Sequence, residues 1–411
     1  MKINIKDIKF HYFLLGALLF VFLLAEYHRV GDFGFYYEAS TDFLNGENIY
    51  QKLYVDGLFW YFGSPVLTYL MVPFTFFSAK IAAIIFGCVS IAAIIRSLVI
   101  IDFFITSRAK NRLQIKFFWL SVFCLSFPIY SHFHFQQFTI VTMYLGLESI
   151  YQEKIKNKQL FAGFLIAFGL FIKLYTIVLI PYFLYRGKFK PVIYSGAFAF
   201  LSISATYLIF DIEYVNQLWK GWISQISKNE WDYLLEIEME NNHGIGTLIS
   251  SLFIVDLPKE AVPVRNHIIE LSKENVYIII CTAKVVLISF TLYFIRTLPF
   301  KQAKDKRYFA WEISYLFLVI PLIFPQQRPY NFVLLLPAIY YILTYVNLHQ
   351  KKYVVALLIV SVVLINLELW LGEFREYYTH FKTLTYGSLG LLITLSLSKP
   401  AKSSKELTLN E

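Results

Sequence analysis

A single carboxylate, Asp32, stands where the first long apolar segment of the chain ends and a polar stretch begins. A carboxylate in such a position can act as a general base that removes a proton from an attacking hydroxyl group. Ionisable side chains at membrane depth are rare because they are costly, so each one is a functional candidate. Aspartate is also a favoured helix N-cap. Capping is therefore the alternative role of Asp32, although Phe35 stands where a capping box would place Glu or Gln.

Two cations occupy comparable positions at the ends of later apolar segments. Lys173 interrupts an apolar run, and Arg328 lies in a tight polar turn between two such runs. An arginine can bind an anion such as phosphate through two parallel hydrogen bonds. The alternatives are that Lys173 snorkels to the membrane interface and that Arg328 anchors the chain to lipid phosphate or to a helix end.

Two further groups of polar residues resemble metal ligands. We interpret His132, His134 and His243 as interfacial hydrogen-bonding residues, and the alternating acids from Glu236 to Glu240 as part of a solvated loop. The chain carries no Walker loop, no Gly-x-Gly-x-x-Gly and no Asp-x-Asp pair, so nothing indicates a nucleotide site. We predict no metal ion and no cofactor.

The composition is that of a polytopic membrane protein. Hydrophobic residues make up 57% of the 411 residues and charged residues 16%, with a mean hydropathy of +0.56. The net charge of +9 does not indicate nucleic acid, because Lys and Arg cluster in short loops and set the membrane topology instead. Cys88, Cys124 and Cys281 lie far apart in apolar segments and indicate packing roles.

The polar stretch after the first apolar segment predicts a helix outside the cytoplasm. Its aromatic residues recur at helical spacing over residues 33–44, which predicts a helix with one aromatic face. Between Gly31 and Asp56 the loop has five acids and one base, Lys52, so the positive-inside rule places it on the outer side. Residues 65–77 form an apolar run of about 13 residues, shorter than the roughly 20 that a spanning helix needs. We predict a re-entrant segment there.

The remaining apolar runs predict an all-α, polytopic transmembrane bundle with about 12 crossings. The chain forms one integral membrane domain, 1–411, with both termini cytoplasmic, a first outer loop at 27–64 and a cytoplasmic tail at 399–411. A large outer loop at 211–275 contains an interfacial helix rich in Trp. The polar residues from Ser131 to Gln137 are predicted to form a turn on the outer side. The first apolar segment has no small-residue cleavage site and is interpreted as an uncleaved helix.

Several short motifs together resemble glycosyltransferase family 87. They are the stretch from Asp32 to Ala39 with Leu44–Tyr50, Gln137, Ala162–Leu165 with Lys173, Asn242, and Leu334–Pro337. The resemblance covers residues 31 to about 340. The chain departs from the family pattern at Phe62–Pro65, lacks the glycine before Gln137, and carries Tyr330 where many members have His.

The resemblance implies a GT-C membrane fold and a polyprenyl-phosphate sugar donor carrying mannose or a related hexose or pentose. The acceptor is a lipid-linked or cell-envelope glycan, and the site faces the outer side of the plasma (inner) membrane. An inverting displacement would use Asp32 as general base, with Arg328 and Lys173 on the donor phosphate. The resemblance further implies a set of substrate-binding residues: Tyr36, Tyr37, Gln137, Asn242 and His243.

Two other classes of protein fit part of the pattern. A polysaccharide polymerase or O-antigen ligase is also polytopic, but would carry more Arg in its outer loops. A transporter of lipid-linked sugars would show two repeated halves with broken helices, and the sequence contains no such repeat.

Overall fold

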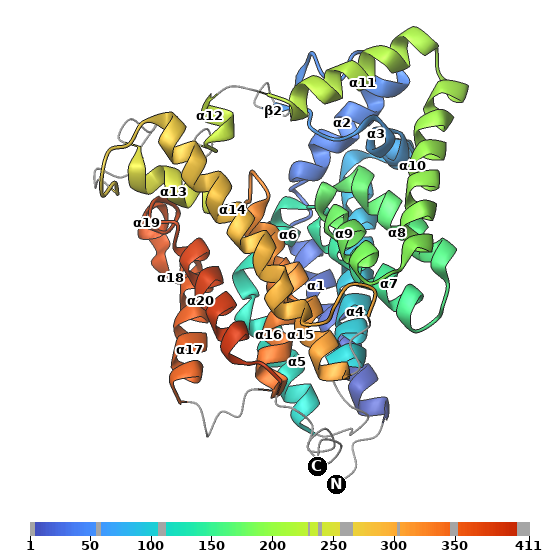
Figure 1. The fold of residues 1–411 in the computed structure, drawn as a ribbon. Helices are drawn as coiled ribbons and strands as arrows, with labels where there is room; N and C mark the ends of the chain where they lie inside the picture. Colours follow the sequence, from blue (N-terminus) through green and yellow to red (C-terminus); the bar gives the residue numbers. More distant parts are fainter. Residues whose placement is uncertain are drawn as a thin grey trace.

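The computed structural model describes residues 5–54, 59–105, 112–228, 231–236, 241–254, 266–301, 305–345 and 352–400. These residues form an almost entirely helical protein (Figure 1), as the composition predicts. Among them, the only sheet is a two-stranded antiparallel hairpin in which β1 (Leu53–Tyr54) pairs with β2 (Phe59–Trp60).

The helices of the first half of the chain are α1 (Ile5–Ala25), α2 (Asp32–Leu44), α3 (Pro65–Met71), η1 (Val72–Phe76), α4 (Ala79–Ile105), α5 (Arg112–Cys124), α6 (Ser126–Phe135), α7 (Thr139–Lys154), α8 (Gln159–Ile172), η2 (Leu174–Val178), α9 (Leu179–Tyr185) and α10 (Phe189–Ile209). Those of the second half are α11 (Ile212–Ile226), α12 (Trp231–Leu234), α13 (Ile245–Phe253), α14 (Lys273–Ile295), α15 (Lys306–Ile323), η3 (Pro329–Leu335), α16 (Leu336–Tyr345), α17 (Lys352–Asn366), α18 (Glu368–Leu371), η4 (Gly372–Phe374), α19 (Arg375–His380) and α20 (Thr383–Leu397).

Within the described residues, three helices are long and apolar enough to cross a membrane: α4, α10 and α14. A fourth span is formed if α17 and the segment Glu368–His380 are taken together across their 60° bend. The other apolar helices have 10–17 residues, among them Pro65–Phe76 at the predicted re-entrant position. The chain is thus an all-α membrane protein in which many apolar runs form helices shorter than a standard span.

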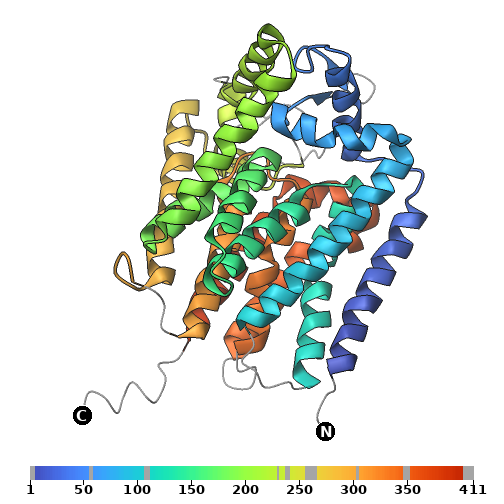
Figure 2. The same cartoon turned by 90° about the vertical axis from the view of Figure 1, so that its right-hand side faces the viewer.

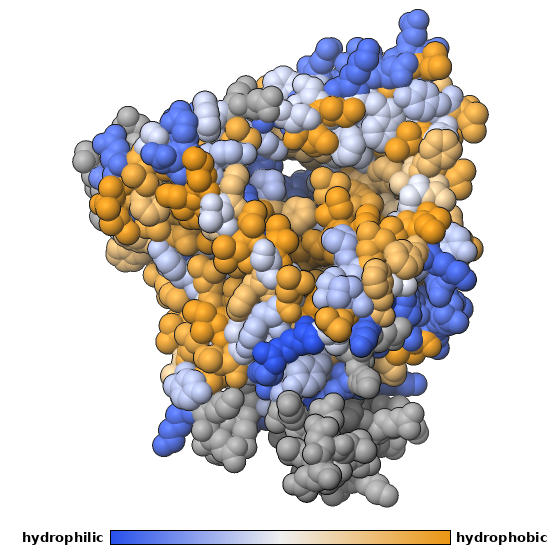
Figure 3. All heavy atoms as spheres, in the orientation of Figure 1, coloured by the Kyte–Doolittle hydropathy of each residue, from blue (hydrophilic) through white to orange (hydrophobic). Residues whose placement is uncertain are grey.

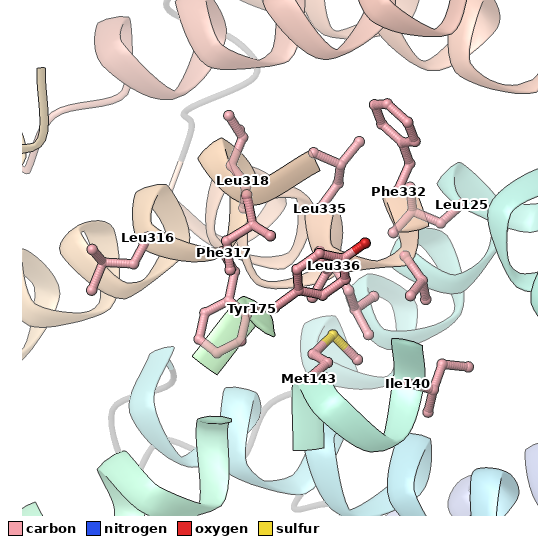
Figure 4. Packing of buried hydrophobic residues seen from close by; sticks show 14 of the residues in the cluster. Leu125, Ile140, Met143, Tyr175, Leu316, Phe317, Leu318, Phe332, Leu335 and Leu336 are labelled. Carbon is pink, nitrogen blue, oxygen red and sulfur yellow. The ribbon is translucent and has the colours of Figure 1, made fainter. Parts of the chain in front are cut away.

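The core lies where α7, α15, η3 and α16 meet. Every residue from Phe309 to Leu322 in α15 is buried. Figure 4 shows Phe317 of α15 and Met143 of α7 beside Leu336 of α16. By contrast, only 11% of the apolar window of α10 and 17% of that of α14 is buried in the protein. Those two helices therefore present apolar surface that lipid would cover.

A layer of short elements covers one end of the helices. In Figure 1, α2, α3 and α11 lie together at the top, and Figure 2 shows the same layer from the side. A small, mainly aromatic cluster holds the layer together. At its centre lie Phe35 and Phe43 of α2, Leu218 of α11, and Tyr50 and Tyr61 from the segment between α2 and α3. The predicted helix at 33–44 and the predicted Trp-rich helix are both confirmed, as α2 and α11.

Three sequence predictions about local structure are wrong. Residues 131–135 continue α6 and do not form a turn, because the chain reverses only at Gln136, which adopts the left-handed conformation with φ 53°. The residues of α13 form a largely buried helix inside the stretch 211–275 that was predicted to be an outer loop. Glu236 is not solvated: it is 4% exposed and its carboxylate accepts a hydrogen bond from Lys284 Nζ at 2.5 Å. Glu238 and Glu240 lie outside the described residues.

Candidate active site

A cavity of about 620 Å³ lies between the layer of short elements and the helical body. Figure 3 shows the molecule hollowed below this layer, above a largely apolar surface. Five of the predicted catalytic and binding residues line the cavity together: Asp32, Tyr36, Gln137, Lys173 and Arg328. They come from four separate parts of the chain, so tertiary packing brings them to one place.

Asp32 is the first residue of α2, and Gly31 is the N-cap. Gly31 has φ +57°, and a Cβ there would lie 2.7 Å from the Phe135 carbonyl oxygen, so the tight approach of α2 to α6 requires glycine. No side chain caps this helix. The Asp32 carboxylate accepts a hydrogen bond from Gln137 Nε2 at 2.5 Å instead. The capping alternative for Asp32 is therefore wrong.

The surroundings of Asp32 make its carboxylate more basic than that of an ordinary aspartate. Burial raises the pKa of Asp32, while the charges of Arg328 and Lys173 and the hydrogen bond from Gln137 act in the opposite direction. A buried carboxylate that is balanced by cations and held by an amide combines the basicity and the fixed orientation that proton abstraction requires.

Lys173 lies at the break between α8 and η2, where its extended backbone (φ −150°, ψ 136°) ends the first helix. Its ammonium group donates hydrogen bonds to Thr139 Oγ1 at 2.9 Å and to Asn331 Oδ1 at 3.1 Å. It also lies 4.9 Å from the centre of the Tyr330 ring. The side chain is thus held at the cavity by residues of α7 and η3, a geometry that does not match snorkelling outward.

Arg328 lines the cavity from the turn between α15 and η3, and its charge acts on Asp32. The neighbouring residue, Gln327, fixes this turn. Its backbone N–H donates to Asn242 Oδ1 at 2.6 Å, and its carbonyl accepts from the His243 N–H at 2.7 Å. The Tyr175 hydroxyl contacts the Gln327 side chain at 3.3 Å.

The other predicted substrate-binding residues, Tyr37, Asn242 and His243, are not among the cavity-lining residues. The Tyr37 hydroxyl donates to the Phe77 carbonyl at 2.9 Å. Asn242 and His243 are buried behind the turn that carries Arg328. The rings of His132 and His243 are buried without hydrogen-bond partners in the described part of the chain, so their interpretation as interfacial hydrogen-bonding residues is wrong.

Several residues that complete the site carry no functional signal in the sequence. Thr139 and Asn331 hold Lys173, and their hydroxyl and amide are bonded to each other at 2.7 Å. Both lie in apolar runs whose periodicity indicates only helix. Trp60 and Trp222 line the cavity from the covering layer. Trp222 was part of the predicted interfacial helix, but nothing in that pattern indicated a ligand-facing side chain.

The arrangement combines a carboxylate, an arginine, a lysine and an aromatic surface in one cavity. Burial lowers the pKa of Lys173 to about 7, while the charge of Asp32 acts in the opposite direction. The Asp32 carboxylate can take a proton from a bound hydroxyl group, and Lys173 and Arg328 can neutralise an anionic leaving group. A cavity of this size, mainly apolar with a few convergent polar groups, is typical of sites for small organic ligands.

Comparison with known proteins identifies one family. The model of glycosyltransferase family 87 matches residues 61–325, more than half of the 411 residues. The match includes Gln137 and Lys173 and ends before Arg328; Asp32 precedes it. No curated protein and no solved structure matches the chain.

Proposed function

Since the chain belongs to glycosyltransferase family 87, we propose that it transfers a sugar from a polyprenyl-phosphate donor to a lipid-linked or cell-envelope glycan. The main support for this proposal is that Asp32, Lys173 and Arg328 line the same cavity. The sugar is mannose or a related hexose or pentose. With a hexose as the sugar, the protein is a hexosyltransferase. Family membership favours this function over that of a transporter.

The reaction is a single inverting displacement at the anomeric carbon. The oxygen of an acceptor hydroxyl attacks that carbon, and Asp32 takes the hydroxyl proton. The bond from the anomeric carbon to the phosphate oxygen breaks, and polyprenyl phosphate leaves as an anion that Arg328 and Lys173 stabilise. Gln137 donates to Asp32 Oδ2, so Oδ1 is the oxygen that receives the proton. A second carboxylic acid is not needed, because a phosphate leaves without protonation.

The fold proposed for this reaction is a GT-C bundle with about 12 crossings and both termini in the cytoplasm. The cavity then faces the extracytoplasmic side of the plasma membrane, as the acid-rich first loop indicates. Its position beneath a covering layer and beside apolar surface suits a donor that arrives through the bilayer. The break after α8 at Lys173 and the turn after α15 that carries Arg328 suit the edge of a polar cavity, where helices can end without exposing backbone to lipid.

The function is tested with the purified protein in lipid nanodiscs. The substrates are polyprenyl-phosphate mannose, other polyprenyl-phosphate hexoses and pentoses, and nucleotide-activated sugars as the comparison, each with a membrane glycan extract as acceptor. We expect release of polyprenyl phosphate and sugar transfer with at least one lipid-linked donor. Transfer from nucleotide sugars in place of lipid-linked ones would rule out the proposed donor class.

We predict that Asn242→Ala lowers kcat/KM for the donor about tenfold, although Asn242 does not line the cavity. The substitution leaves the buried N–H of Gln327 without its acceptor, a loss worth about 1–3 kcal/mol, and loosens the turn that carries Arg328. The measurement is steady-state kinetics with separate donor and acceptor titrations. Asn241→Ala is the matched control, since the neighbouring Asn241 side-chain oxygen accepts a hydrogen bond from the Thr379 hydroxyl at 3.3 Å and does not line the cavity. Equal kinetics in both variants would show that the turn does not depend on Asn242.

A further inference from the structure

The side of the cavity formed by the covering layer differs in chemistry from the side that carries the cations. We call this surface the aromatic wall; it consists of Trp60, Phe62, Gly63, Ser64, Trp222 and Ile226. None of these six residues has an ionisable side chain. Lys173 and Arg328 approach the cavity from other elements, the break after α8 and the turn before η3.

Three hydrogen bonds hold the loop of the aromatic wall in place. The Trp222 indole N–H donates to the Phe62 carbonyl at 3.3 Å, and the Tyr50 hydroxyl donates to the Gly63 carbonyl at 2.7 Å. The Ser64 hydroxyl donates to the Phe171 carbonyl at 2.8 Å, which ties the loop to α8. Since these bonds occupy carbonyl groups of the loop, the wall offers ring faces to a ligand more than backbone acceptors.

The two tryptophans are accessible from the cavity. Trp60, in β2, is 39% exposed, and Trp222 is half-buried in α11. Tryptophan presents a large, rigid surface at low entropic cost. The apolar C–H face of a sugar ring matches such a surface, whereas a phosphate group does not.

The loop of the aromatic wall is closely packed at Gly63. A Cβ on Gly63 would lie 2.3 Å from the Tyr61 hydroxyl oxygen, so the loop keeps glycine where it borders the cavity. The cavity volume of about 620 Å³ lies within the range of about 300–1,000 Å³ for pockets that hold drug-sized ligands, and two sugar rings with one phosphate make a ligand of that size. Space therefore remains for a second sugar beside the donor.

The third cationic side chain among the lining residues, Arg29, is already engaged. Its guanidinium contacts Glu26 at 3.5 Å and His134 Nε2 at 2.9 Å, and His134 Nδ1 lies 3.0 Å from the same Glu26 carboxylate. A negative charge beside Arg29 makes this corner a poor site for a second anion. The described lining residues thus provide charge for one phosphate, at Lys173 and Arg328.

We propose that the aromatic wall is the acceptor subsite and that it binds a neutral sugar ring by stacking on Trp60 and Trp222. This inference rests on the proposed function and adds the class of acceptor: an uncharged glycan residue, with phosphorylated sugars excluded. The acceptor hydroxyl then points from the wall toward Asp32, while the donor phosphate lies at the cations.

The test uses two acceptors that differ by one phosphate, octyl α-mannoside and its 6-phosphate, with polyprenyl-phosphate mannose as donor in nanodiscs. Trp60→Ala is expected to raise KM for octyl α-mannoside about tenfold, which corresponds to about 1.4 kcal/mol, because the variant loses a large apolar surface on which the sugar ring stacks. Trp60→Phe should restore most of the affinity, and the donor KM should change less than about twofold. The control is Trp370→Ala, since Trp370 is 75% exposed in α18 and does not line the cavity.

Binding is measured in parallel as the change in tryptophan fluorescence on titration with each mannoside, so that the test does not depend on turnover. Loss of the octyl α-mannoside response in Trp60→Ala, with the wild-type response intact, supports the acceptor subsite. Two results overturn it: unchanged acceptor affinity in Trp60→Ala, or tighter binding of the 6-phosphate than of the neutral mannoside. Wild-type protein that binds octyl α-mannoside at Trp60 but releases no polyprenyl phosphate would contradict the proposed function and not the subsite.

Discussion

Asp32→Asn is expected to lower the rate of sugar transfer by about 100-fold or more, because a positioned general base contributes about 10²–10⁴-fold. Asparagine has nearly the same shape as aspartate, and its carbonyl oxygen can still accept the hydrogen bond from Gln137 Nε2. The substitution thus removes basicity and negative charge and leaves the geometry in place. The measurement is kcat and donor affinity of the folded variant. We expect donor binding to persist while kcat falls.

Asp42→Asn is the matched control for this experiment. Asp42 lies in the same helix, α2, and pairs with Lys52 at 2.8 Å, away from the cavity. Its loss removes an acid from the same loop without touching the site, so transfer should stay within about twofold, as for a partly exposed surface pair. If Asp32→Asn retained more than about a tenth of the wild-type rate, Asp32 would not be the base.

The pH profile of kcat/KM should place the acid limb above the pKa of about 3.9 that an ordinary aspartate has. Burial raises the pKa of Asp32, and only the ionised form can accept a proton, so activity is lost as the pH falls through this raised pKa. The Gln137 hydrogen bond lowers the pKa. Gln137→Ala should therefore shift the limb to still higher pH. If the acid limb of Gln137→Ala lies at the same pH as that of the wild type, the group that titrates in this limb is not Asp32.

Arg328→Ala is expected to lower kcat/KM for the lipid-phosphate donor by about 100-fold, the lower end of the effect of removing one electrostatic contact to a developing anion. Arg328→Lys keeps the charge but loses the planar fork that binds two phosphate oxygens, so a loss of about tenfold is expected. The measurement is donor turnover at saturating acceptor. Arg375→Ala, an exposed position in α19, is the control. Near-normal rates in both Arg328 variants would leave Arg328 as an anchor at the membrane interface.

Local pattern alone determined some of the helices and some of the breaks between them. The aromatic spacing over residues 33–44 predicts α2, the spacing of apolar residues and tryptophans predicts α11, and a lysine in an apolar run predicts the end of α8 at Lys173. These features follow from the sequence because helix periodicity and the cost of burying a charge act over one or two turns. The motifs that contain Lys173, Gln137 and Asn242 likewise predict the family from the sequence alone, and the family is confirmed.

Only the tertiary structure decided which of these residues share a cavity. Gln137 bonds to Asp32 across 105 positions of the chain, and Asn331 meets Lys173 across 158. No local signal distinguishes Gln137, which lines the cavity, from Asn242, which holds the turn behind it. The role of Asp32 as a cavity carboxylate and not a cap depended on the close approach of α6 at Gly31. Such contacts result from how whole helices pack, and a hydrophobic pattern specifies which face is buried without specifying its partner.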